Sequence, residues 1–216
     1  MFEIKTNKFS YELPATIDPS SKFLFFLHGK FAEFYGPNSI HPNFGIYDYH
    51  GKVKAFAKHD FVVISEIRCN KTNPYRYAGK VARQVKTLLA NCVPPENITV
   101  AGFGKGGLIA IYTSARLKNP DVKFVVMSGC SSKGVRFRRT HINYVNLLSP
   151  LFQGHFLSIH DVSDVKCNIC HRVFDVASDK ITFKEVIVKE GLERGLFYQP
   201  REAWIEPVVE WINNKH

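Results

Sequence analysis

The 216-residue sequence lacks the segments that would place a chain outside the ordinary globular proteins. Its N-terminus has no basic region followed by a long apolar run, so we expect no secretory signal. No apolar run is long enough to span a bilayer, and we therefore expect no membrane partner. There are no repeats and no biased segments typical of disorder. With 45% hydrophobic residues, the chain can fill one substantial core, which predicts a single domain over residues 1–216.

Cysteines are few, and their number is odd. Five cysteines in a chain without a signal predict reduced thiols and a cytoplasmic protein rather than a disulfide framework. Cys167, Cys170 and His171 match the C-x-x-C-H pattern of covalent haem attachment, but that chemistry belongs to exported chains. A zinc site would need a second cysteine pair, and the spacing of Cys69, Cys92 and Cys130 offers none. We therefore expect no metal and no cofactor.

Acidic residues are too few to balance the basic ones, and the formal net charge is +10. The densest basic run is Lys133–Arg139, which could attract nucleic acid or another anionic surface. No recognition motif accompanies this run, and the other basic residues are spread over the whole chain. We interpret it as a solvated loop, which argues against a nucleic-acid partner.

Short apolar runs alternate with amphipathic helical patterns along most of the chain. This alternation predicts an α/β fold with a mostly parallel sheet and helices on both faces. The segment Ser131–Gly154 interrupts it and is interpreted as an insertion or lid-like segment. The expected strands are Phe23–Leu27, Phe61–Ile67, Ile98–Ala101, Lys123–Met127, Phe156–His160 and Ile181–Val188. The expected helices are Gly51–Lys58, Tyr75–Cys92, Gly106–Lys118, Lys166–Ala177 and Arg201–Asn213, the last burying Trp204, Val208 and Trp211.

The stretch ITVAGFGKGG has two interpretations. Gly102, Gly104 and Gly107 match the dinucleotide-binding pattern G-x-G-x-x-G between a strand and a helix. That pattern requires an acidic residue after the next strand, to hold the ribose hydroxyls. The next strand is followed by Ser128-Gly129-Cys130, which has no carboxylate, so we set the nucleotide interpretation aside.

The second interpretation is G-x-S-x-G, the turn that presents a nucleophilic serine, with glycine in place of the serine. Four segments agree with it in order: FLFFLHGK, ITVAGFGKGG, IHDVSDV and EGLERGLFYQPREAWIEPVVEWI. Together they make the chain resemble small esterase-like proteins of the α/β-hydrolase-fold superfamily over nearly its whole length. The resemblance implies an oxyanion-hole loop, a nucleophile elbow, an acid and a histidine, in that order.

The resemblance assigns each of these positions to a residue. The nucleophile position falls on Gly104, the acid position on Asp164 with Asp161 as the alternative, and the histidine position on Arg194. The oxyanion hole would use backbone N–H groups near Lys30 and Phe31, after a turn oriented by His28, and that of Lys105. Two of the three triad members are therefore replaced.

These replacements predict a catalytically degenerate protein. Glycine has no nucleophile, and arginine stays protonated near neutral pH and cannot act as a base. Arg194 is expected either to pair with Asp164 or to lie on the surface. With Lys30 and Lys105 it would favour a small anion or carboxylate as the ligand. A Ser→Gly change introduced on purpose would leave Arg194 unexplained.

Two other hypotheses remain open at this point. The first is a working esterase or thioesterase that uses other residues. Cys130 is a poor candidate for its nucleophile, since no histidine stands beside it in the sequence. The second is a protein-interaction module that uses the basic segment Ser131–Gly154.

Overall fold

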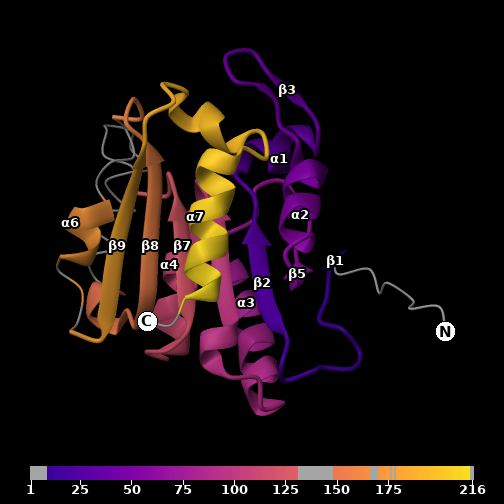
Figure 1. Cartoon of the computed structure of the whole chain (residues 1–216), viewed down its shortest axis with the longest axis vertical. Helices are drawn as coiled ribbons and strands as arrows, with labels where there is room; N and C mark the ends of the chain where they lie inside the picture. The colour runs from indigo at the N-terminus through magenta and orange to yellow at the C-terminus, as the bar shows by residue number, and fades with distance from the viewer. Residues whose placement is uncertain (1–8, 131–147, 166–169, 176, 178, 215–216) are drawn as a thin grey trace.

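A computed structural model describes residues 9–130, 148–165, 170–175, 177 and 179–214. Its centre is a seven-stranded sheet in the order β1-β5-β2-β6-β7-β8-β9, and every neighbouring pair is parallel (Figure 1). The parallel arrangement puts the loops that follow all seven strands on the same edge of the sheet, called here the carboxyl edge. The strands are β1 (Phe9–Ser10), β2 (Lys22–Leu27), β5 (Phe61–Ile64), β6 (Ile98–Phe103), β7 (Lys123–Met127), β8 (Gly154–Asp161) and β9 (Ile181–Val188).

Helices cover both faces of this sheet. α3 (Pro74–Ala90), α4 (Lys105–Leu117) and α6 (Cys170–Phe174) contribute to the core on one face. α2 (Tyr49–Ala57) and α7 (Glu202–Asn213) contribute to the core on the other face, and α7 crosses in front of the sheet in Figure 1. The side chains of β2 alternate between the two cores, which explains why its apolar run is continuous. The predicted fold class is confirmed.

Most predicted elements are present, with differences at their ends. The strand expected over Phe61–Ile67 ends at Ile64, and the hydroxyl of Ser65, the next residue, donates to the carbonyl of Phe26 at 2.6 Å. Within the described residues, the helix expected over Lys166–Ala177 is only α6. The sequence did not predict α1 (Lys30–Tyr35), or the hairpin of β3 (Ile40–His41) and β4 (Gly45–Ile46).

The last helix is held by its apolar face and by its C-terminus. Trp204, Val208 and Trp211 are buried as predicted. The last carbonyls of a helix have no partner within it. Lys123 reaches them from β7, its Nζ donating to the carbonyls of Ile212 at 2.9 Å and Asn214 at 2.7 Å. This buried lysine therefore serves as a C-terminal cap.

The prediction of reduced thiols is wrong for two of the cysteines. Cys130 follows β7 and Cys170 begins α6, and packing of α6 on that face joins them in a disulfide with a Cα–Cα distance of 5.1 Å. The Sγ of Cys170 is therefore not available for haem attachment, and Cys167 lies outside the described residues. Cys69 and Cys92 are free and exposed. Sequence spacing could not predict this pair, since 40 residues separate its members.

The interruption expected at Ser131–Gly154 falls mainly outside the described residues, which resume at residue 148. The described end of this segment holds the short helix η2 (Ser149–Leu151) and the first residue of β8. Among the described residues, no helix is long and apolar enough to cross a membrane. The same part of the chain holds no group of three or more His, Cys, Asp or Glu side chains that could bind a metal.

Candidate functional site

The turn between β6 and α4 has an unusual backbone conformation at Gly104, the residue predicted for the nucleophile position. Gly104 is the N-cap of α4 and has φ 54° and ψ −111°, a conformation costly for residues with a Cβ. Its N–H donates to the carbonyl of Met127 at 2.8 Å, which holds the turn against the end of β7. A Cβ built on Gly104 would meet no atom within 4 Å. There is room for a side chain, so the backbone conformation is what favours glycine.

The other glycines of the cluster are explained by close packing. A Cβ on Gly102 would lie 2.2 Å from the backbone of Gly106, and a Cβ on Gly106 would lie 2.0 Å from the carbonyl oxygen of Leu27. A Cβ on Gly29 would lie 2.8 Å from the ring of Phe103. The glycines let β6, the start of α4 and the end of β2 approach one another, which accounts for them without a bound dinucleotide.

Phe103, immediately before Gly104, connects this turn to two other loops. Its ring centroid lies 5.2 Å from that of Phe197 and 6.1 Å from that of Tyr198, both near Arg194 in the sequence. It also stacks on Tyr47 at 6.4 Å. Phe103 thus contacts both the segment that carries Arg194 and Tyr47, which follows β4. It brings these segments and the β6–α4 turn together at the carboxyl edge.

Asp164 and Arg194 lie together, as one of the two sequence-based alternatives expected. Asp164 follows β8 and is buried, and its Oδ2 lies 3.5 Å from the Nε of Arg194. The Arg194 side chain is 35% exposed and belongs to the short helix η3 (Glu193–Phe197). The Glu193 N–H donates to the hydroxyl of Ser163 at 3.0 Å, which ties the two loops together.

Asp161, the alternative acid, is occupied by its own loop. Its carboxylate accepts hydrogen bonds from the N–H of Ser163 at 2.9 Å, the Ser163 hydroxyl and the N–H of Glu190 at 3.2 Å. Burial acts to raise the pKa of Asp161, but these hydrogen bonds outweigh it and lower the pKa. Asp161 therefore organises the loop after β8, and Asp164 is the acid that faces Arg194.

Lys30 and Phe31 are the first two residues of α1, the short helix in the segment after β2. Lys30 is exposed, with its Nζ 5.0 Å from the centroid of the Phe34 ring. Phe31 packs against the rings of Tyr35, His41 and Tyr198 at 4.7, 5.1 and 5.7 Å. These contacts give Phe31 a packing role and leave Lys30 in contact with solvent.

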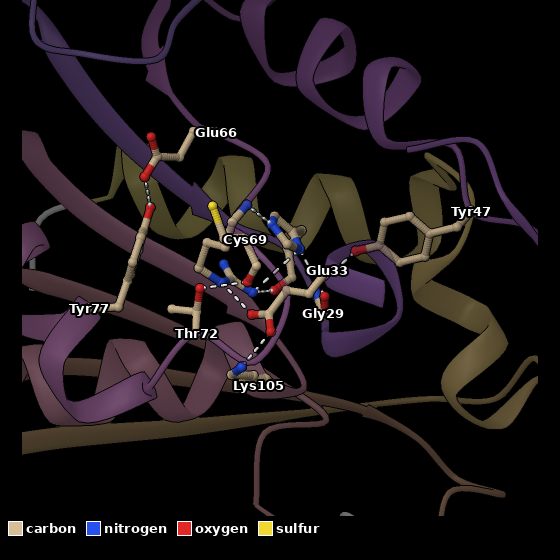
Figure 2. Close-up of polar contacts among 10 residues, drawn as sticks. Gly29, Glu33, Tyr47, Glu66, Cys69, Thr72, Tyr77 and Lys105 are labelled. Atoms are coloured by element: carbon tan, nitrogen blue, oxygen red, sulfur yellow. Dashed lines mark hydrogen bonds and ion pairs between the residues drawn. The ribbon is translucent and has the colours of Figure 1, made fainter. Parts of the chain in front are cut away.

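A buried group of charges links this loop to its neighbours (Figure 2). We call Glu33, Arg68 and Lys105 the Glu33 cluster. Glu33 Oε1 accepts from Arg68 Nε at 2.8 Å, with both side chains fully excluded from solvent, and Glu33 Oε2 pairs with Lys105 Nζ. Glu33 lies on α1 after β2, Arg68 follows β5, and Lys105 directly follows Gly104. One carboxylate therefore ties together the loops after three adjacent strands.

His28 completes the cluster and has the turn-orienting role expected of it. Its Nε2 accepts from the N–H of Arg68 at 2.8 Å, and its Nδ1 donates to the carbonyl of Gly29 at 2.8 Å. Both hydrogen bonds require a neutral ring. Burial, and after it the charge of Arg68, lowers the pKa of His28 well below its usual value. The neutral histidine thus fixes the backbone at the start of the loop after β2.

The cluster also changes the role expected of Lys105. Burial lowers the pKa of Lys105, while the contact with Glu33 opposes this effect. Its ammonium is paired within the protein instead of being offered to a ligand. Sequence reasoning missed Glu33 and Arg68. The available signal was that both follow predicted strands whose carboxyl ends lie at one edge of the sheet.

No protein-family model matches the chain. Among solved structures, it is similar to Arabidopsis thaliana SOBER1 (12% identity, TM-score 0.54), over 89% of this chain and 98% of that one. A Paleococcus ferrophilus monoacylglycerol lipase has 12% identity and a TM-score of 0.57, over 88% and 93% of the two chains. A lipase-esterase related protein from Clostridium acetobutylicum has 15% identity and a TM-score of 0.53, over 92% and 96%.

One sequence similarity is stronger and shorter. The chain is 33% identical over 78 residues to acyl-protein thioesterase 1 of Saccharomyces cerevisiae. The match covers 36% of this chain and about a third (34%) of the length of that relative. Together with the parallel sheet and the helices on both faces, these similarities show that the chain has the α/β-hydrolase fold, with esterases and lipases among its structural neighbours.

Proposed function

We propose that this protein is a catalytically degenerate α/β hydrolase that binds a small anion or carboxylate above the β6–α4 turn. The observation that carries the proposal is Gly104, which has a positive φ in the turn between β6 and α4 and has no side chain. Acyl transfer needs an oxygen or sulfur nucleophile at this position and a base beside it. Glycine supplies no nucleophile.

Arg194 supports the same proposal. Its guanidinium remains protonated at neutral pH, so it cannot take a proton from a nucleophile or return one to a leaving group. It is anchored to buried Asp164 and stays 35% exposed, so a solvent-borne anion can reach part of it. Gly104 provides no side-chain cap for the 13-residue helix α4, and the N-terminus of a helix attracts negative charge. The proposed ligand is therefore a small carboxylate or phosphate.

The Glu33 cluster can keep the carboxyl edge ordered in a protein that has lost its catalytic residues. Its ion pairs hold the backbone near Lys30 and Phe31 against the start of α4, independently of the residues at the nucleophile and histidine positions. Backbone N–H donors survive the loss of any side chain. The frame of a hydrolase site can thus persist as a binding site.

Three measurements test this function: ester hydrolysis, fluorophosphonate labelling and calorimetric titration with anions. The protein should hydrolyse p-nitrophenyl acetate only at a low background, since loss of a triad can cost about 10⁶ in kcat. A serine-directed fluorophosphonate should not label it.

Acetate and inorganic phosphate, titrated by calorimetry, should bind the wild type and bind Arg194→Met more weakly. Arg83→Met, which changes an exposed arginine on α3, should bind like the wild type. Equal binding by all three proteins would refute the anion site.

A working esterase or thioesterase is the second candidate, favoured by the 33% match to an acyl-protein thioesterase. It would use a nucleophile other than the residue at position 104. Fluorophosphonate labelling of one serine, abolished by heat unfolding, would establish this candidate and identify that serine.

We also propose that the protein is located in the cytoplasm. This proposal rests on the small, odd number of cysteines, whereas the disulfide between Cys130 and Cys170 is of a kind more common in oxidising compartments. Trapping thiols with a maleimide in intact cells would show whether Cys130 and Cys170 are reduced or joined in the disulfide. A cytoplasmic pool in which Cys130 and Cys170 react would agree with the expected location.

A further inference from the structure

Four of the exposed large apolar side chains belong to α1 and the β3–β4 hairpin, which follow β2 at the carboxyl edge. Phe34 and Tyr35 at the end of α1 are 40% and 68% exposed, and Ile40 and Ile46 of the β3–β4 hairpin are 73% and 48% exposed. We call these four residues the hairpin patch. Large apolar side chains exposed together mark a contact surface more often than isolated ones do.

The patch consists of two pairs of side chains on segments that are hydrogen-bonded to each other. The rings of Phe34 and Tyr35 lie 6.4 Å apart, and the hydroxyl of Ser39 donates to the carbonyl of Tyr35, which ties the hairpin to the end of α1. Ile40 and Ile46 are direct partners in the β3–β4 ladder, so their side chains lie on the same face of the hairpin. Figure 1 shows this hairpin extending beyond the body of the protein next to α1.

The hairpin is held from behind by aromatic contacts. The ring of His41 stacks on Phe44 at 4.6 Å and packs against Phe31 at 5.1 Å, and Phe44 packs against Tyr198 at 5.2 Å. The hairpin thus has one face anchored to the protein and one apolar face exposed. Anchoring matters, because a surface that is already ordered loses little conformational entropy on binding.

The charges around the patch favour an anionic partner. Between residues 29 and 47 the one carboxylate is Glu33, which is buried in the Glu33 cluster, whereas Lys30 is exposed beside Phe34. The whole chain carries a formal net charge of +10. A protruding apolar pair flanked by aromatic rings and a lysine fits an interfacial lipid layer, which adapts to a convex surface.

We propose that the hairpin patch docks the protein on the surface of an anionic lipid bilayer. Ile40 and Ile46 enter the acyl boundary, Phe34 and Tyr35 lie at the headgroup level, and Lys30 meets the lipid phosphates. This is peripheral binding and does not depend on the proposed function at Gly104. It departs from the expectation of no membrane partner, which was based on the lack of an apolar run long enough to span a bilayer.

The test uses the whole chain and sedimentation with vesicles. Wild type should bind vesicles of phosphatidylcholine with about a third phosphatidylserine, and bind pure phosphatidylcholine more weakly. The double variant Ile40→Ser/Ile46→Ser should bind the anionic vesicles about tenfold more weakly, since it loses apolar burial. Leu151→Ser, which changes an exposed apolar residue before β8 at the opposite edge of the sheet, should bind like the wild type.

Each other outcome would overturn the proposal. If wild type does not sediment with anionic vesicles, there is no lipid-binding surface. If the double variant binds as tightly as wild type, the remaining basic surface binds the lipid and the patch has no part in it. If wild type is a dimer and the double variant a monomer in analytical ultracentrifugation, the patch is the contact with a second copy.

Discussion

The Glu33 carboxylate lies 2.8 Å from the Arg68 Nε, and neither side chain is exposed to solvent. The other oxygen of the same carboxylate pairs with Lys105, the residue after Gly104. A buried ion pair contributes less than its Coulomb energy because of desolvation, but removal of one partner leaves a buried charge without compensation. The relationship between Glu33 and Arg68 therefore predicts a large effect of a single substitution.

Glu33→Gln should lower the free energy of unfolding by about 3–5 kcal/mol, since it leaves Arg68 buried without its counter-charge. Urea unfolding followed by circular dichroism measures this. Glu12→Gln is the matched control, because Glu12 is 68% exposed in its pair with Lys80 at 3.4 Å, and an exposed pair contributes about 0–1 kcal/mol. Similar losses in the two variants would contradict the structural role of the cluster.

Asp164→Ala should destabilise the protein more than Glu12→Gln does, by about 1–3 kcal/mol. The Asp164 side chain is 1% exposed, and its removal takes away the carboxylate that lies 3.5 Å from the Nε of Arg194. The urea unfolding midpoints of the two variants are compared, provided that the free energy of unfolding has the same slope against urea concentration in both. An unchanged midpoint for Asp164→Ala would mean that the ion pair with Arg194 contributes nothing.

Gly104→Ser and Arg194→His together should restore some ester hydrolysis, while each alone stays inactive. A serine without a base is a poor nucleophile, and a histidine without a nucleophile has nothing to activate. Members of a triad act as a unit, so the double variant should exceed the sum of the singles. Hydrolysis of p-nitrophenyl acetate and fluorophosphonate labelling at position 104 measure the effect.

The serine should also cost about 1–3 kcal/mol of stability, because it adds a Cβ at φ 54°. Gly104→Ser combined with Arg194→Gln is the control without a base, and it should remain inactive. A folded double variant that neither hydrolyses the ester nor takes up the label would show that these positions do not correspond to a triad.

The pH dependence of stability should show a contribution from Lys123. Burial lowers the pKa of Lys123 from 10.5 to about 8. Between these values the unfolded chain binds more protons than the folded protein, so the stability due to this group rises with pH through that window. The free energy of unfolding of wild type minus that of Lys123→Met should therefore increase by about 1–3 kcal/mol from pH 8 to 10.5. If this difference in the free energy of unfolding stays constant or falls as the pH rises, burial does not lower the pKa of Lys123.

Reduction of the Cys130–Cys170 disulfide should lower stability by about 2–4 kcal/mol, because the bond restricts the unfolded chain between positions 40 residues apart. Urea unfolding with and without dithiothreitol measures the loss. Cys92→Ala should lose as much on reduction as wild type, since Cys92 is free and exposed. Cys130→Ala/Cys170→Ala should be insensitive to the reductant, and sensitivity of that variant would locate the effect elsewhere.

Local patterns in the sequence determined the fold class. Continuous apolar runs such as Phe23–Leu27 predict strands buried on both faces, because a parallel sheet is covered by helices on both sides. The position of Gly104 between a strand and a helix could be predicted for the same local reason. Gly104 and Arg194, on which the proposal of a degenerate site is based, are also single positions, so that proposal could be made from the sequence alone.

Only the tertiary structure decided which side chains meet. Glu33, Arg68 and Lys105 are far apart in the sequence, and they meet because the order β5-β2-β6 brings their loops to one edge. The same holds for the disulfide, since α6 packs against β8 and β9 on one face of the sheet, where its first residue, Cys170, meets Cys130. A sequence pattern records the periodicity of one element, whereas contacts between loops depend on strand order and register. That order is set by packing of the whole chain.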